Sequence, residues 1–136
     1  MSLSRVRSII EAAGYGVLAT VIDNQPRVRP MAFVMLDDGR LWSSTYRVSG
    51  KLREIERNAS VEVCFVDPSR VQVRITGTLS TAGGGEQRRK LLELNPKVRR
   101  HFADENDERF VHLEIVPTRI RWKEPGFNEY HEVALP

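Results

Sequence analysis

Hydrophobic and polar side chains alternate in several segments of this chain with a period of two, which is typical of β-strands that bury one face. The clearest example is residues 70–82, where Val71, Val73 and Ile75 share one face and polar side chains share the other. The same pattern, together with β-branched residues and flanking turn residues, predicts the other strands. The predicted strands cover residues 15–22, 27–36, 40–44, 60–67, 70–82, 109–116 and 118–124.

Three other segments have the character of helices. Residues 4–13 place apolar side chains at the i, i+3, i+4 and i+7 positions of an amphipathic helix. Residues 49–58 predict a second helix and residues 86–102 a third. We expect the third helix to be interrupted near Pro96, because proline lacks the backbone N–H that a helix interior requires. For a similar reason we expect Pro117 to divide the last two strands.

Tight turns join most of the predicted strands, and few helices lie between them. This order favours an antiparallel sheet. Gly77, in the middle of a strand, predicts a bulge or bend of the kind that lets barrel strands curl. We therefore predict a mainly β, α+β fold, a six-stranded antiparallel β-barrel with peripheral helices. The sequence has no repeat and no long linker, so residues 1–136 are expected to form a single domain.

Composition narrows the classes of protein that fit. The net charge of +3 permits nucleic-acid binding without requiring it, and it equally suits a small anionic ligand. No apolar run approaches the ~20 residues that cross a bilayer, so we predict no membrane association and a cytoplasmic location. The single cysteine, Cys64, lies in a predicted strand and is expected to be buried.

The turn and helix within residues 40–58 indicate an anion site. Ser49 is a natural N-cap, because its hydroxyl can accept a bond from the free N–H groups of the first helical turn. Lys51 falls in that first turn, where a cation opposes the helix dipole. This placement is explained if a phosphate binds at the helix start. The alternative is that Lys51 is a solvated surface residue.

Three further sets of residues could bind a ligand. Arg27 and Arg29 share a strand face and could grip an anion or stack on a planar ring, or they could simply be exposed. Gln72 offers both a donor and an acceptor to an amide- or imide-bearing heterocycle, or it is an ordinary outward polar residue. Trp122 could cover an aromatic ligand or simply pack. The three histidines lack the spacing of a metal site, and no hydrolytic motif occurs, so we predict no metal.

Taken together and in order, these features resemble the pyridoxamine 5'-phosphate oxidase-like family of FMN-binding split barrels. The resemblance runs from about Ser4 to Lys123. Its landmarks are LATV (18–21), PRVRPM (26–31), RLWSSTYRVSGKLREIERN (40–58), NASVEVCFVD (58–67) and VQVRITGTL (71–79). The resemblance implies a six-stranded antiparallel split β-barrel that forms a homodimer, with FMN at the interface.

The resemblance also implies which residues bind the cofactor. They are Arg27, Arg29, Pro30, Met31, Ser44, Thr45, Ser49, Lys51, Gln72 and Trp122. Arg27, Arg29, Pro30 and Met31 would line the isoalloxazine ring and part of the phosphate site. Ser44 and Thr45 would lie near the ribityl chain and phosphate. Ser49 and Lys51 would hold the phosphate. The glutamine would reach the flavin across the dimer, and the tryptophan would lie near the ring.

The implied function is that of an FMN-dependent oxidoreductase acting on an unidentified small molecule. The ending RIRWKEPGFNEYHEVALP lacks the Arg-x-His-type substrate motif of true pyridoxamine phosphate oxidases, which argues against oxidation of vitamin B6. Because flavins carry the redox chemistry themselves, no catalytic residue of the protein is predicted. The alternatives are a reductase of the same fold that uses the deazaflavin F420, a redox-inert flavin binder and an OB-like nucleic-acid-binding barrel. Nucleic-acid binding is not expected, because aromatic residues do not interleave with the basic ones.

Overall fold

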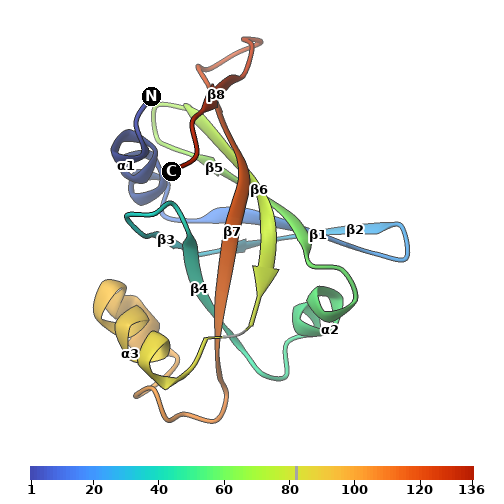
Figure 1. The fold of residues 1–136 in the computed structure, drawn as a ribbon, viewed down its shortest axis with the longest axis vertical. Helices are drawn as coiled ribbons and strands as arrows, with labels where there is room; N and C mark the ends of the chain where they lie inside the picture. Colours follow the sequence, from blue (N-terminus) through green and yellow to red (C-terminus); the bar gives the residue numbers. More distant parts are fainter. Residues whose placement is uncertain (82) are drawn as a thin grey trace.

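The chain folds as an eight-stranded antiparallel sheet with three α-helices (Figure 1). The computed structural model describes residues 1–81 and 83–136, apart from the side chain of residue 51. The helices are α1 (Leu3–Ala13), α2 (Gly50–Arg57) and α3 (Gly85–Leu94), and a 3-10 helix, η1, spans Pro96–Arg100. The strands are β1 (Gly16–Ile22), β2 (Gln25–Met31), β3 (Val34–Met35), β4 (Leu41–Tyr46), β5 (Ser60–Val66), β6 (Gln72–Ser80), β7 (Phe110–Lys123) and β8 (His131–Val133).

The sheet curls into a barrel that does not close. Its strand order is β2-β1-β5-β6-β7-β4-β3, with β8 paired to β7, and in the described part of the chain the end strands β2 and β3 do not pair with each other. β1, β2, β4, β5, β6 and β7 are the longer strands, and β3 and β8 are short additions. The predicted fold class, a mainly β split barrel with peripheral helices, is confirmed.

Alternation in sequence becomes alternation in burial along the strands. On β6, Val73 and Ile75 are fully buried, whereas Arg74 between them is half-buried on the outer face. α1 adds Val6 and Ile9 to the same core. The core therefore fills the barrel, and the outer face of β5, β6 and β7 carries the polar side chains.

A second apolar cluster lies between β4, β7 and the segment formed by α3 and η1. Its buried members are Trp42, Leu91, Leu92, Val98, Phe102 and Phe110. The rings of Phe102 and Phe110 stack with their centroids 4.4 Å apart. This cluster holds α3 at the same end of the sheet as α2, the lower end in Figure 1.

The single strand predicted over residues 27–36 is divided into β2 and β3. At the break, the hydroxyl of Ser43 on β4 donates a hydrogen bond of 2.5 Å to the carbonyl of Ala32. Phe33 and Met35 are buried on either side of the half-buried Val34, so side-chain alternation continues through the break. The periodicity therefore could not reveal where the backbone leaves the ladder.

β7 runs through Pro117 without the predicted division into two strands. Gly77 pairs with Pro117, whereas Thr76 pairs with Arg119, so Thr118 is an extra residue in a β-bulge. The hydroxyl of Thr118 donates to the carbonyl of Thr76 at 3.2 Å. The bulge accommodates the proline, which lacks a backbone N–H. The irregularity predicted at Gly77 lies at this bulge.

The burial predicted for Cys64 is wrong. Its side chain is half-buried and lies on the outer face of β5, because Val63 and Phe65 on either side of it occupy the core face. The side chain therefore belongs to the mixed outer surface of the sheet, next to Arg74 on β6.

Candidate functional site

A pocket of about 410 Å³ opens where the turn after β4 leads into α2. Ser49 and Gly50 line it at the start of the helix. Three arginines also line it: Arg47 from the turn, Arg53 from α2 and Arg88 from α3. We refer to this site as the α2 pocket. It joins a helix N-terminus to three cationic side chains, two of them near the helix start in sequence and the third, Arg88, distant from it.

The positive charge of the α2 pocket is not neutralised by ion pairs. No carboxylate of the described residues lies within ion-pair distance of its three arginines. Arg47 instead donates to the carbonyl of Glu108 at 2.9 Å, and Arg88 to that of Glu105 at 2.8 Å. These bonds orient the guanidinium groups without removing their charge. Glu56 also lines the pocket but leaves an excess of cations, so the site is suited to an anion.

The predicted phosphate residues lie at this helix start. Ser49 immediately precedes α2, and its carbonyl accepts a bond of 3.2 Å from the N–H of Leu52. Lys51 lies in the first turn of the helix, and its side chain falls outside the described residues. The turn that the sequence predicts to be a phosphate site therefore borders the α2 pocket.

Arg27 and Arg29 bind the side of α2 and do not line the α2 pocket. Arg29 donates to the Thr20 hydroxyl at 2.8 Å and to Glu54 at 2.6 Å, and Arg27 lies 3.3 Å from the same carboxylate. Thr20 also donates to Glu54, at 2.6 Å. This bond, opposed by burial and supported by the two arginines, holds the pKa of Glu54 below its ordinary value. The network fixes α2, and with it the helix start, against the β1–β2 hairpin.

A second pocket, of about 400 Å³, lies between β4 and the α3–η1 segment. We refer to it as the β4 pocket. Its lining includes four of the predicted cofactor residues, Pro30, Met31, Ser44 and Thr45. Tyr46 and Phe102 add aromatic walls, and the Tyr46 hydroxyl lies 3.1 Å from Nδ1 of His101. The β4 pocket thus combines flat apolar surfaces with hydroxyl groups, as a planar polar ligand requires.

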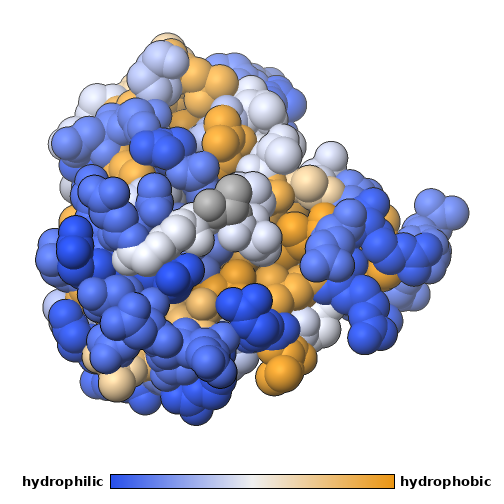
Figure 2. Space-filling view, turned by 60° about the horizontal axis from the view of Figure 1, so that its bottom comes forward, coloured by the Kyte–Doolittle hydropathy of each residue, from blue (hydrophilic) through white to orange (hydrophobic). Residues whose placement is uncertain are grey.

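The two pockets lie along the same end of β4. Ser44, Thr45 and Tyr46 line the β4 pocket, and the next residue, Arg47, lines the α2 pocket. Figure 2 turns this end of the molecule toward the reader and shows hydrophobic surface exposed between more hydrophilic regions. A ligand with both an anionic group and a flat ring could use both pockets.

Gln72 and Trp122 lie apart from both pockets. Gln72 accepts a hydrogen bond of 2.9 Å from the hydroxyl of Tyr130, and Trp122 packs on His131 with ring centroids 4.9 Å apart. β1 and β5 separate β2 from β6 in the sheet, which is a distance of roughly 14 Å at the usual strand spacing. A single chain therefore does not bring Gln72 to Pro30.

A buried histidine, His112, lines the α2 pocket from β7. It is 2% exposed, and neither ring nitrogen has a hydrogen-bond partner among the described residues. Burial lowers the pKa of His112 to about 4, so its ring is neutral at neutral pH. A Cβ at Gly83 would lie 2.1 Å from its Nδ1, so this position requires a glycine. Trp42 packs edge-on against the ring, with centroids 4.5 Å apart.

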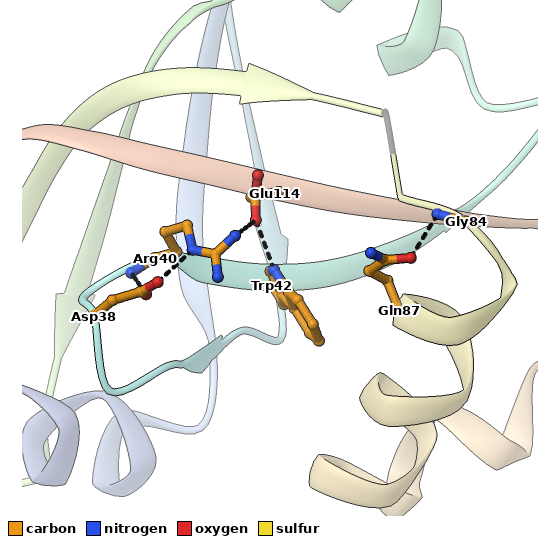
Figure 3. Close-up of polar contacts among 6 residues, drawn as sticks. All are labelled: Asp38, Arg40, Trp42, Gly84, Gln87 and Glu114. Carbon is orange, nitrogen blue, oxygen red and sulfur yellow. Dashed lines mark hydrogen bonds and ion pairs between the residues drawn. The ribbon is translucent and has the colours of Figure 1, made fainter.

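Two separate sets of polar contacts line a pocket that His112 also lines, one between β4 and β7 and one at the start of α3 (Figure 3). Glu114 on β7 accepts bonds from Arg40 at 2.6 Å and from Nε1 of Trp42 at 3.0 Å. At the start of α3, the side chain of Gln87 accepts a bond of 3.0 Å from the N–H of Gly84. The first set joins β4 to β7, and the second caps α3, the helix from which Arg88 lines the α2 pocket.

Residues 3–123 match the family model described as pyridoxamine 5'-phosphate oxidase. The chain belongs to the pyridoxamine 5'-phosphate oxidase family. The family resemblance inferred from the sequence is confirmed by this match, which covers nearly the whole chain. No match was found among curated proteins.

Solved structures share the fold of this family member. A putative pyridoxamine 5'-phosphate oxidase from Listeria innocua is 28% identical with a TM-score of 0.72, over 88% of this chain and 95% of that chain. A pyridoxamine 5'-phosphate oxidase-related, FMN binding protein from Nostoc punctiforme is 20% identical with a TM-score of 0.73, over 97% and 94%. A heme binding protein from Mycobacterium smegmatis is 16% identical with a TM-score of 0.74, over 93% of this chain and 55% of that chain. The last two likenesses show the fold alone.

Sequence reasoning did not select several residues that line the α2 pocket of this family member. Arg47 and Arg53 lie inside the segment that marked the anion site, and their charge could have been added to that of Lys51. Arg88 and His112 reach the pocket only through the packing of α3 and β7, so no local pattern could have found them. Among the described residues, no group of His, Cys, Asp or Glu is arranged to hold a metal, and no helix is long and apolar enough to span a membrane.

Proposed function

We propose that this member of the pyridoxamine 5'-phosphate oxidase family binds FMN, with the 5'-phosphate in the α2 pocket. One observation carries the proposal: Arg47, Arg53 and Arg88 converge on the N-terminus of α2 without a carboxylate partner among the described residues. A dianionic phosphate would supply the missing negative charge, and Ser49 and Lys51 would complete its binding site. The chemistry of these donors fits the phosphate of a flavin nucleotide.

The β4 pocket supports the rest of the ligand. Pro30 and Met31 would line the isoalloxazine ring, and Ser44 and Thr45 would lie near the ribityl chain, since all four border this pocket. Its volume is in the usual range for small-ligand sites. Arg27 and Arg29 would contribute from the neighbouring strand, chiefly by holding α2 in place through Glu54.

We further propose that the FMN site is completed by a second copy of the chain in a homodimer. Gln72 and Trp122 would approach the ring from the partner copy, because within one chain β1 and β5 hold them away from Pro30. Val66, the strand partner of Gln72, is 47% exposed, and Val17 on β1 is 44% exposed. Exposed valines beside the predicted ring contacts support an interface on this outer face.

Bound FMN would supply hydride and electron transfer, and the residues named above would bind it and set its orientation. We propose on this basis a flavin-dependent oxidoreductase that acts on a small molecule. The Nostoc relative described as FMN binding supports the choice of cofactor. F420 also carries a phosphate, so the α2 pocket alone does not distinguish a deazaflavin-dependent reductase.

The test is the absorption spectrum of the purified protein, followed by mass analysis of the cofactor released by acid. We expect a flavin spectrum and the mass of FMN, or stoichiometric uptake when FMN is added to cofactor-free protein. Released F420 would support the deazaflavin alternative instead. A haem spectrum, or failure to take up either flavin, would overturn the proposal. Anaerobic stopped-flow mixing of the FMN-loaded protein with NADH or NADPH then tests reduction, and a redox-inert binder would show none with either donor.

A further inference from the structure

A tyrosine from the C-terminal tail covers a cationic patch on the outer face of β6 and β7. The guanidinium carbons of Arg74 and Arg121 each lie 5.0 Å from the centre of the Tyr130 ring, and Nζ of Lys123 lies 5.9 Å from it. The Tyr130 hydroxyl donates to Gln72 at 2.9 Å. We refer to these five residues as the outer-face cluster. It lies on the opposite side of the sheet from the barrel core.

The charges of the outer-face cluster are poorly balanced. Arg74 and Arg121 are directly opposite each other on adjacent strands, where like charges destabilise a sheet. Glu62 accepts a bond of 3.1 Å from Arg121, but no carboxylate of the described residues lies within ion-pair distance of Arg74. Lys123 donates to the carbonyl of Gly126, which leaves its charge in place. Glu132, which lies opposite Arg121 on β8, forms its ion pair with Arg119. Among the described residues, the three cations of the cluster therefore share Glu62 as their one ion-pair partner.

Two donors in the outer-face cluster also lack acceptors. Nε of Arg74 and Nε of Arg121 are buried, and neither has a hydrogen-bond partner among the described residues. The ring of Tyr130 attracts the guanidinium charges, but it offers these N–H groups no in-plane acceptor oxygen. A carboxylate would satisfy such donors with charge-assisted bonds, which are among the strongest in proteins.

We propose that the outer-face cluster is a binding site for a planar aromatic carboxylate, and that Tyr130 occupies it until the ligand displaces the tyrosine ring. The contacts of Tyr130 indicate the chemistry of the ligand that the site accepts. Its ring lies against two guanidinium groups, and its hydroxyl donates a hydrogen bond to the Gln72 amide. A hydroxylated aromatic acid would make both contacts and add the missing negative charge. The site shares Gln72 with the proposed flavin site and borders the proposed dimer interface, but its contacts with Tyr130 are made within one chain. If both are occupied, the acid lies next to the flavin as a candidate substrate.

The proposal is tested by isothermal titration of the cofactor-free protein with 4-hydroxybenzoate. The neutral, similarly shaped 4-hydroxybenzamide serves as the control ligand. We expect the acid to bind and the amide to bind at least tenfold more weakly. Tyr130→Ala removes the competing ring and its hydrogen bond and should tighten binding of the acid by about tenfold. Arg74→Gln should abolish binding, whereas Arg57→Gln, on α2 and paired with Asp23, should leave the affinity unchanged.

Cys64 provides a second readout that shows where the acid binds. It is the only cysteine of the chain and lies opposite Arg74 on the neighbouring strand. Cys64 lies next to Val17 on the face of the proposed dimer interface, so its alkylation is followed in Tyr130→Ala protein that also carries Val66→Glu. Saturating 4-hydroxybenzoate should slow alkylation of Cys64 in this protein, whose fold is checked by circular dichroism. Equal binding of acid and amide, unchanged affinity in Arg74→Gln, or unchanged or weaker affinity in Tyr130→Ala would each overturn the proposal. Because no flavin is present, these outcomes are independent of whether the α2 pocket binds FMN.

Discussion

Arginine side chains have three different environments in this molecule, and the partner of each decides what it can do. Arg29 is held by Glu54 and Thr20, so its charge stabilises the contact between α2 and the hairpin. Arg74 lies against an aromatic ring. Arg53 faces the α2 pocket and makes no ion pair with any described residue. Arg53 is therefore the residue whose charge is most directly available to a ligand.

Replacing Arg53 with glutamine should weaken FMN binding roughly ten- to a hundredfold. The reason is the loss of one charge-assisted contact to the phosphate, which is worth about 1.5–3 kcal/mol. The matched control is Arg57→Gln on the same helix, because Arg57 pairs with Asp23 and does not line the α2 pocket. Fluorescence titration of cofactor-free protein with FMN measures both. Equal affinities for the two variants would place the phosphate elsewhere.

His112 should make the stability of the protein depend on pH. Burial lowers its pKa to about 4, whereas in the unfolded chain the pKa is about 6.5. The unfolded state therefore binds more protons between these values, so the free energy of unfolding should fall as the pH drops from 6.5 to 4. The loss from this group is on the order of 3 kcal/mol. The charges that face the ring are Glu114, which raises the pKa, and Arg88 and Arg40, which lower it further.

Urea unfolding at several pH values, compared between the wild type and His112→Asn, measures this contribution. The variant should show a smaller loss of stability across the window from pH 6.5 to 4. Glu54, whose pKa is held below the ordinary value of 4.5, loses its stabilising charge as the pH falls past that value, but both proteins retain this residue, so its contribution cancels in the comparison. Parallel curves for the two proteins would mean that His112 is not buried as a neutral group.

At the scale of elements, local chemistry predicted most helices and strands, and failed where a tertiary contact decided. α1, the interruption at Pro96 and the irregularity at Gly77 all follow from local sequence chemistry. The break between β2 and β3 depends on a bond from Ser43, which comes from a different strand. The continuity of β7 through Pro117 depends on a bulge against β6. Neither the break between β2 and β3 nor the continuity of β7 is indicated by a sequence pattern within its own segment.

Substituting Gly77 with alanine should destabilise the fold by about 1–3 kcal/mol, the usual effect of overpacking. A Cβ at Gly77 would lie 2.5 Å from the backbone carbonyl oxygen of Val116, and backbone cannot move aside as a side chain can. The control is Gly50→Ala, where a Cβ meets nothing within 4 Å and alanine favours the helix. Thermal unfolding measures both. The structure is contradicted if Gly77→Ala is as stable as Gly50→Ala.

At the scale of the whole molecule, the sequence predicted the members of the candidate site better than their arrangement. The family resemblance named ten residues, of which Ser49 lines the α2 pocket and Pro30 the β4 pocket. Gln72 lies on β6, which β1 and β5 separate from the strand of Pro30 in this sheet. Motif order cannot show that separation, nor can it show Arg88 entering the pocket from α3. The separation is the physical reason for proposing a dimer.

The last prediction concerns the interface of the proposed dimer. Val66→Glu would place a charge on an exposed valine that neighbours Gln72, so it should shift the protein from dimer to monomer in light scattering after gel filtration. FMN affinity should fall with it, because the contacts from the partner's Gln72 and the partner's Trp122 are lost. Leu94→Glu, at a leucine of similar exposure on α3, is the control and should remain a dimer with unchanged affinity. A Val66→Glu protein that stays dimeric places the interface on another face. A monomer that keeps full affinity would show that one chain holds FMN by the α2 and β4 pockets alone.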